Sequence, residues 1–129
     1  MKLLKDIMKN QLSENASVLI IGNEILSGRT IDKNFNFIAS KLNEHGISIS
    51  ESRTVSDNEQ EIINAINELR KKYNYVFTTG GIGPTHDDVT AESISKAFNV
   101  ELEINEEAYK ILEDYYKELG SEFNDVRQR

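Results

Sequence analysis

The sequence contains no cysteine, and this absence excludes disulfides, thiolate metal sites and a cysteine nucleophile. It also has few basic residues: 15 Lys and Arg against 22 Asp and Glu give a formal net charge of −7. No basic run longer than three residues interrupts this acidic composition. The charge balance argues against a nucleic-acid-binding surface, so we expect no nucleic-acid partner.

Long apolar runs are missing as well, and none approaches the length that spans a membrane. The amino-terminal stretch mixes lysines with its leucines, so it lacks the apolar block of a secretion signal. We therefore expect a cytoplasmic protein with no membrane partner. Leu4, Ile7, Met8 and Leu12 fall at helical spacing and predict a helical extension over residues 1–15.

The remaining residues alternate between strand-like and helix-like patterns. The apolar run Val18–Ile21 has no polar alternation and predicts a central parallel strand, and Tyr75–Phe77 predicts another. Ile47–Ser50 and Val100–Ile104 alternate and predict more exposed strands, while Ser52–Val55 predicts a further strand. At 129 residues the chain is long enough for one domain. This order predicts an α/β fold with three α/β/α layers and a mostly parallel sheet.

Four helices are expected after the extension. Asp32 and Asn105 can cap the first and the last, and Ser56 with Glu59 matches a capping box for the second. In chain order, the predicted apolar faces are Phe35, Ile38, Ala39 and Leu42; Ile62, Ala65, Ile66, Leu69 and Tyr73; Ala91, Ile94 and Phe98; and Ala108, Ile111, Leu112, Tyr115 and Leu119.

The stretch Thr78–Thr90 is a glycine-rich loop between a predicted strand and a predicted helix. Its glycines allow a sharp turn and close approach to a ligand. The helix that follows offers unpaired amides and the positive end of its dipole, which favour an anion such as a phosphate. The adjacent carboxylates of Asp87 and Asp88 suit this place if a cation bridges them to the phosphate, since like charges otherwise repel.

Two better-known phosphate loops do not match this stretch. A Walker A loop requires a lysine directly followed by Ser or Thr after its second glycine, and no such pair is present here. A dinucleotide fingerprint requires a third glycine where this loop has His86.

The loop does resemble the signature of the molybdopterin-binding domain family. That signature, T-T-G-G-x-G followed by D-x-T, is matched by Thr78–Gly83 and by Asp88–Thr90. The form of Gly83–Asp88 resembles the branch that contains competence/damage-inducible protein A and the amino-terminal domain of eukaryotic FAD synthase. The resemblance implies a molybdopterin-binding-domain-like fold over residues 16–129. Family domains generally continue further, which leaves a truncated domain, a short member or a degenerate copy as alternatives.

The resemblance also implies roles for individual residues. Asp88 matches a functional acid tied to metal and phosphate chemistry, and Thr90 matches a threonine that bonds the loop or the ligand. Asp57 follows a strand, where a helix cap is an equal alternative, and matches a second family acid. Asp87 either shares the cation with Asp88 or is solvated. His86 is expected to be exposed and not an essential base.

The family's first loop lines the same pocket and is matched by Gly22, Asn23 and Glu24, with Ser27 and Gly28 completing that wall. The predicted catalytic residues are thus Asp88 and Asp57, and the predicted metal ligands are Asp88 and Asp87. The predicted ligand- or phosphate-binding residues are Gly22, Asn23, Glu24, Ser27, Gly28, Thr79, Gly80, Gly81, Gly83, Thr85 and Thr90.

The expected function is metal-dependent hydrolysis of a nucleotide diphosphate of the ADP-ribose or FAD type. The expected cofactor is a divalent cation (Mg²⁺, Mn²⁺ or Co²⁺). The alternative is a non-catalytic molybdopterin- or nucleotide-binding module or a molybdenum cofactor biosynthesis protein. In either case the partner is a small phosphate ester, a nucleotide or a pterin. The family further implies a homo-oligomer, either a dimer or a trimer.

Overall fold

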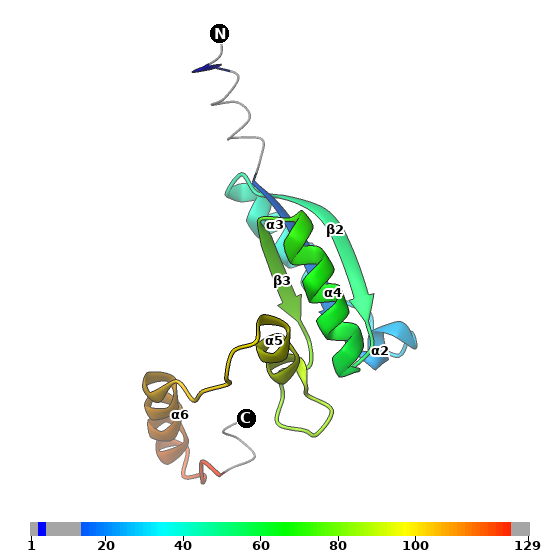
Figure 1. Ribbon diagram of the computed structural model, residues 1–129. Coiled ribbons are helices and arrows are strands. Elements are labelled where there is room, and N and C mark those ends of the chain that lie inside the picture. The colour runs from blue at the N-terminus through cyan, green and yellow to red at the C-terminus, as the bar shows by residue number, and fades with distance from the viewer. Residues whose placement is uncertain (1–2, 5–13, 125–129) are drawn as a thin grey trace.

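The computed structural model describes residues 3–4 and 14–124, so most of the predicted extension over residues 1–15 lies outside the described residues. Within this part of the chain, three parallel strands form one sheet in the order β2-β1-β3 (Figure 1). They are β1 (Asn15–Ile21), β2 (Ser48–Val55) and β3 (Tyr75–Thr79). The central, buried position of β1 confirms the strand expected from its apolar run. β2 is one continuous strand where two separate segments were predicted.

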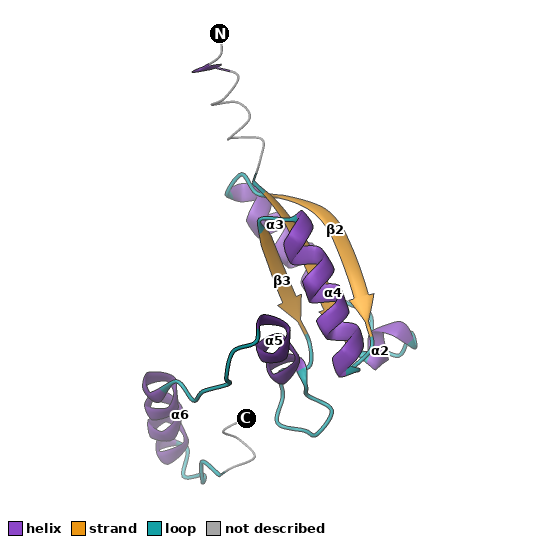
Figure 2. Ribbon diagram, in the orientation of Figure 1, coloured by secondary structure: helices purple, strands orange, loops and turns teal. Residues whose placement is uncertain are grey.

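Helices lie on both faces of this sheet. The helices described, in chain order, are α2 (Asn23–Leu26), α3 (Asn34–Glu44), α4 (Glu59–Lys72), α5 (Thr90–Phe98) and α6 (Glu106–Glu118). The chain moves from β1 outward to β2 and then back across β1 to β3, and both crossovers are expected to be right-handed. The two crossover helices must therefore lie on opposite faces, and Figure 2 shows α4 in front of the sheet with α3 behind it. The three-layer prediction is confirmed.

The core lies between α4 and the central strand. The predicted apolar stripe of α4 packs against β1, and burying each such large side chain contributes about 1.5–3 kcal/mol. The buried cluster consists of Leu19, Ile21, Ile62, Ala65, Ile66 and Leu69. α5 packs beside α4, where the guanidinium of Arg70 donates to the Ala97 carbonyl at 3.3 Å and lies 4.5 Å from the Phe98 ring centroid. These contacts hold α5, and with it the glycine loop, at one place on the sheet.

Two of the predicted helix caps are confirmed. The Asp32 carboxylate accepts hydrogen bonds from the amides of Asn34, at 3.3 Å, and Phe35, at 3.1 Å, at the start of α3. The Asn105 side chain accepts one from the Ala108 amide at 2.9 Å at the start of α6. Each cap satisfies an amide that the helix itself leaves unpaired.

The capping box predicted for Ser56 and Glu59 is wrong. α4 begins at Glu59, and the cap is Asn58, whose side chain accepts from the Glu61 amide at 3.1 Å. The Ser56 hydroxyl instead bonds to the Glu61 carboxylate. The helix starts later than the pattern suggested because β2 and its following turn extend to this point.

The strand predicted over Val100–Ile104 is also wrong. α5 ends at Phe98, and its C-cap Asn99 is in the left-handed conformation (φ 52°). The residues that follow have no ladder partner in the described part of the chain. In Figure 1 this segment leads away from the sheet to α6. The alternating apolar residues of this segment give it one apolar side. A period of two does not by itself require a neighbouring strand.

The helix α6 forms as predicted, but its apolar face does not join the core. Ile111, Leu112, Tyr115 and Leu119 are all exposed.

The expected dimer or trimer stays a prediction. No helix in the described ranges has the length and apolar character needed to cross a bilayer.

Candidate functional site

The glycine loop lies directly against the end of β1, and two of its glycines are required by close packing. A Cβ on Gly80 (φ 88°) would lie 1.9 Å from the Ile21 carbonyl oxygen, and one on Gly81 (φ 61°) would lie 2.2 Å from the Thr90 hydroxyl. Both positions also have positive φ, which side-chain-bearing residues rarely adopt. The loop can therefore take this course only with glycine at Gly80 and Gly81.

Thr90 ties the loop to the first turn of α5. Its hydroxyl donates to the Gly80 carbonyl at 2.9 Å, and its amide donates to the Gly81 carbonyl at 3.1 Å. The side chain is buried, so these bonds are sheltered from water. Of the two roles predicted for Thr90, the structure displays bonding to the loop.

We expect Thr90→Val to lower the free energy of unfolding by about 1–3 kcal/mol, because the part-buried Gly80 carbonyl loses its donor with little change in side-chain volume. Thr90→Ser keeps the hydroxyl and is expected to cost less, about 1 kcal/mol for the lost methyl. Urea denaturation followed by circular dichroism measures both values. A valine variant as stable as the natural protein would contradict this role.

Asp88 folds back over the loop that precedes it. One carboxylate oxygen, Oδ2, accepts from the Thr85 amide at 2.9 Å and from the Thr85 hydroxyl at 2.7 Å. The Thr85 hydroxyl, the Thr85 amide and the Gly83 amide, in that order of effect, hold the pKa of Asp88 below its ordinary value of 3.8. The carboxylate is therefore ionised and fixed, and the Gly83 amide predicted to bind phosphate already faces an internal acceptor.

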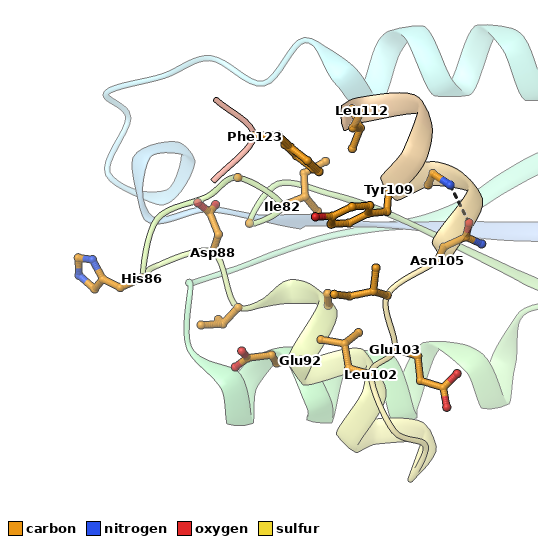
Figure 3. Close-up of a pocket in the computed structure, with 16 residues that line it drawn as sticks. Ile82, His86, Asp88, Glu92, Leu102, Glu103, Asn105, Tyr109, Leu112 and Phe123 are labelled. Carbon is orange, nitrogen blue, oxygen red and sulfur yellow. Dashed lines mark hydrogen bonds between the residues drawn. The ribbon is translucent and has the colours of Figure 1, made fainter. Parts of the chain in front are cut away.

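Asp87 lies apart from this arrangement. Its carboxylate is 2.9 Å from the His86 Nε2, and both side chains are largely exposed. In Figure 3 the His86 imidazole points outward from the loop, as the sequence predicted. The described residues contain no group of three or more His, Cys, Asp or Glu side chains placed to hold a metal ion. Of the alternatives for Asp87, this geometry favours the solvated residue, and a cation shared with Asp88 stays a prediction.

Asp57 and Asn23 join the loops that follow β2 and β1. The Asn23 amide donates to the Asp57 carboxylate at 2.9 Å, and the Asp57 amide donates to the Asn23 side-chain oxygen at 3.2 Å. The neighbouring Gly22 amide donates to the Val55 carbonyl at 3.0 Å. The predicted residues of these two loops are thus brought together, but with each other and not with Asp88.

The rest of the predicted first-loop wall belongs to the short helix α2 and its turn. The Glu24 carboxylate folds over Gly22, where an added Cβ would lie 2.6 Å from its Oε1. The Ser27 hydroxyl donates to the Glu24 carbonyl at 3.3 Å and accepts from Arg29 at 3.1 Å. Gly28 has φ 74° and open space around it, so it serves the turn.

Two cavities flank the glycine loop. The larger, of about 560 Å³, lies between the loop, the start of α5 and α6, and we call it the α6 cavity. The smaller, of about 400 Å³, lies between the loop, α2 and the start of α3, and we call it the α3 cavity. The α6 cavity is lined by Gly81, Ile82, Gly83, His86, Asp88, Val89, Ala91, Glu92, Leu102, Glu103, Ile104, Asn105, Ala108, Tyr109, Leu112 and Phe123. The α3 cavity is lined by Ile20, Ile21, Glu24, Ile25, Thr30, Ile31, Asp32, Lys33, Asn34, Thr79 and Gly80.

The predicted site is therefore divided between two hollows. Gly81, Gly83 and Asp88 line the α6 cavity, whereas Glu24, Thr79 and Gly80 line the α3 cavity. The other predicted residues line neither: Gly22, Asn23, Ser27, Gly28, Asp57, Thr85, Asp87 and Thr90. The sequence analysis did not predict that residues 102–112 form a wall of the α6 cavity. The alternation before α6 and the apolar stripe of α6 were the patterns that could have indicated it.

The start of α5 opens into the α6 cavity. Its N-cap, Val89, makes no side-chain capping bond, and the next residues, Ala91 and Glu92, line the cavity. The structure gives the amides of Ala91 and Glu92 no partner among the described residues. An uncapped helix start of this kind presents donors and the positive dipole end to a ligand.

Comparisons with known proteins show which family the chain belongs to. A family model described as a probable molybdopterin binding domain matches residues 17–124. A protein of Sulfurisphaera tokodaii is 42% identical over 115 residues, which cover 88% of this chain and 44% of that protein. A CinA-like protein of Geobacter metallireducens is 40% identical over 113 residues, covering 88% of this chain and 27% of that protein. The chain thus spans less than half the length of these curated relatives.

Comparison with solved structures also finds proteins of this family. The protein CinA of Thermoplasma acidophilum, described as of unknown function, superposes with a TM-score of 0.79 at 35% identity, covering 90% of this chain and 68% of that one. The tungsten cofactor synthesizing protein MoaB of Pyrococcus furiosus superposes with a TM-score of 0.63 at 28% identity, covering 84% and 66%. On the match to residues 17–124 and these similarities, the chain belongs to the molybdopterin-binding domain family.

Proposed function

We propose that this chain binds a small phosphate ester at the start of α5 and hydrolyses a nucleotide diphosphate of the ADP-ribose or FAD type. One observation carries the proposal: an ionised carboxylate, Asp88, and the uncapped first turn of α5 line one cavity of about 560 Å³. Small-molecule sites usually measure about 300–1,000 Å³. The cavity can therefore hold a whole ligand beside both groups.

The amides of α5 are the groups that would hold the phosphate. No Lys or Arg is among the described residues that line the α6 cavity, and its carboxylates are Asp88, Glu92 and Glu103. A phosphate entering this acidic surrounding needs backbone donors or a cation to offset the repulsion. The start of α5 supplies the donors, because its N-cap, Val89, makes no side-chain capping bond.

A divalent cation fits this site only as a partner of the phosphate. The described residues offer one fixed carboxylate, Asp88, and not a set of three ligands. Mg²⁺ is commonly held in this way, by one or two carboxylates together with substrate phosphates. When bound, such a cation would supply charge neutralisation and a lowered pKa for an attacking water.

The protein's own residues then have separate roles. Asp88 stays ionised and oriented because Thr85 donates to it twice. The amides at the start of α5 offset charge on the phosphoryl oxygens. In this proposal Asp57, first predicted to be catalytic, positions the first loop through its paired bonds with Asn23.

Incubation of the purified chain with ADP-ribose or FAD and Mg²⁺, Mn²⁺ or Co²⁺ tests the proposal. We expect release of AMP, which chromatography measures. AMP release should be lost when the cation is chelated, because no Lys or Arg is among the described residues that line the cavity. Absence of AMP with every substrate and cation would remove the hydrolase.

The alternative is a binding module for molybdopterin or a nucleotide that performs no hydrolysis. The family description and the cofactor-synthesizing relative favour it. Calorimetric binding of the same ligands, with no AMP formed on prolonged incubation, would select this alternative.

A further inference from the structure

The two outer edges of the sheet differ in how well they are protected. β2 and β3 are the outer strands, because β1 lies between them. On β2, Glu51 and Arg53 form an ion pair at 2.7 Å, and the register with β1 shifts between Ala16 and Ser17. Charged side chains and irregular pairing of this kind keep further strands from adding to an edge. The β2 edge is therefore protected.

The β3 edge has neither of these features. Its five residues, Tyr75–Thr79, are all β-branched or aromatic and include no charged residue and no proline. They pair with β1 in continuous register, and no strand pairs with their other side in the described part of the chain (Figure 2). An edge of this composition, with free backbone donors and acceptors, is a template for one more strand.

An aromatic pair lies beside this open edge. Val76 packs against the core cluster beneath α4, so its neighbours Tyr75 and Phe77 point to the opposite face of the sheet. Their ring centroids are 6.5 Å apart, and Tyr75 is 40% exposed. The helix on that face, α3, packs on β2 at the far side of the sheet. The pair thus offers an aromatic surface that a further strand would cover.

A second copy of the same strand fits this edge. Two identical edges related by a two-fold axis pair antiparallel, and such an interface closes on itself. With Phe77 at the axis, the Phe77 side chains of the two copies face each other. Tyr75 then lies opposite Thr79 of the second copy, and Val76 lies opposite its Thr78. No like charges are opposed, and aromatic and threonine pairs of this kind stabilise neighbouring strands.

The charges at the two ends of β3 favour the same arrangement. The last turn of α4, just before β3, carries Arg70, Lys71 and Lys72, and the loop after β3 carries Asp87 and Asp88. In Figure 1 the end of α4 and this loop lie at opposite ends of β3. Antiparallel pairing therefore places the basic turn of one copy beside the acidic loop of the other. This attraction offsets part of the repulsion between two chains that each carry a net charge of −7.

We propose that two copies of this chain join through β3, edge to edge and antiparallel, to form one continuous sheet. The proposal is independent of the proposed function, since no ligand enters into it. It gives the expected homo-oligomer a definite interface. It also selects the dimer over the trimer, because the single open edge of each copy is used by one partner.

The mass of the natural chain in solution, measured by light scattering over a range of concentrations, tests the proposal. The variant Tyr75→Lys places a charge on the β3 edge. Ser52→Lys is the matched control, since Ser52 is an exposed strand residue on the β2 edge. Circular dichroism checks the fold of both variants. Backbone amide exchange of the natural chain gives a readout that needs no variant.

We expect the natural chain to reach twice the mass of one chain as its concentration rises. Tyr75→Lys should weaken dimerisation about tenfold or more, because two cross-strand pairs in each dimer lose their contact. Ser52→Lys should change it less than about twofold, because this residue lies on the other edge. Amides of residues 75–79 should exchange more slowly at high concentration, while those of residues 48–55 should not.

Three results would overturn the proposal. The first is the mass of a single chain at every concentration, or an assembly larger than a dimer. The second is equal weakening of the dimer by Tyr75→Lys and Ser52→Lys. The third is concentration-dependent protection that appears on β2 or α6 and not on β3.

Discussion

Replacing Gly80 by alanine is expected to be the most damaging single change in the described part of the chain. The added Cβ would lie 1.9 Å from the Ile21 carbonyl oxygen, which belongs to the backbone of the central strand and cannot rotate away. Left-handed strain adds about 1–2 kcal/mol and overpacking about 1–3 kcal/mol or more. We expect a loss of about 4 kcal/mol in the free energy of unfolding, a large part of the 5–15 kcal/mol typical of a domain. Urea denaturation measures it.

Gly28→Ala is the matched control for this change. Gly28 also has positive φ, at 74° against 88° for Gly80, but nothing lies within 4 Å of an added Cβ. Gly28→Ala should therefore lower the free energy of unfolding by the backbone strain alone, about 1–2 kcal/mol. Equal losses for the two variants would contradict the close packing of the loop on β1.

Asp88→Asn is expected to have the largest effect on activity. The amide keeps the size of the side chain and can still accept from Thr85, but the negative charge beside the α6 cavity is lost. We expect turnover of ADP-ribose or FAD to fall about a hundredfold or more, the size typical for loss of one electrostatic group at a reacting centre. The circular dichroism spectrum should be unchanged.

The pH dependence follows from the direction of the pKa shift. Thr85 and Gly83 hold the pKa of Asp88 below 3.8, so the carboxylate is charged throughout the neutral range. The ratio of natural to variant turnover should therefore stay constant there and decline only in acid, where Asp88 takes up a proton.

Asp87→Asn is the control for this charge. Asp87 is the adjacent residue and carries the same charge, but it is exposed beside His86 and does not line the cavity. We expect turnover to change less than about twofold, since an exposed charge is screened by solvent. A large loss in this variant, with none in Asp88→Asn, would reverse the roles of the two acids.

Much of the fold could be predicted from local patterns. The apolar run of β1, the stripe of α4 and the caps at Asp32 and Asn105 each depend on neighbours within a few residues, and each is confirmed. The Val100–Ile104 strand failed because a strand requires a partner, and no local pattern reports whether another segment lies within hydrogen-bonding distance.

The candidate site was harder to predict than the fold. The order of residues in the glycine loop was enough to indicate the family. The anion at the helix start and the role of Asp88, which the same residues predict, stay predictions. The order of residues could not indicate that Thr85 and Gly83 already occupy that carboxylate, or that Asp57 pairs with Asn23, since these contacts depend on side-chain direction.

The amino-acid order alone was sufficient for the layered α/β architecture and for the loop that marks the family, because periodic apolar residues and glycines act over short distances. The division of the predicted residues between two cavities, and the wall that α6 adds to one of them, came from the folded chain. The contacts that form these cavities join segments far apart in sequence, and they depend on where α5 and α6 lie relative to the sheet. That path is set by packing and not by any single stretch of residues.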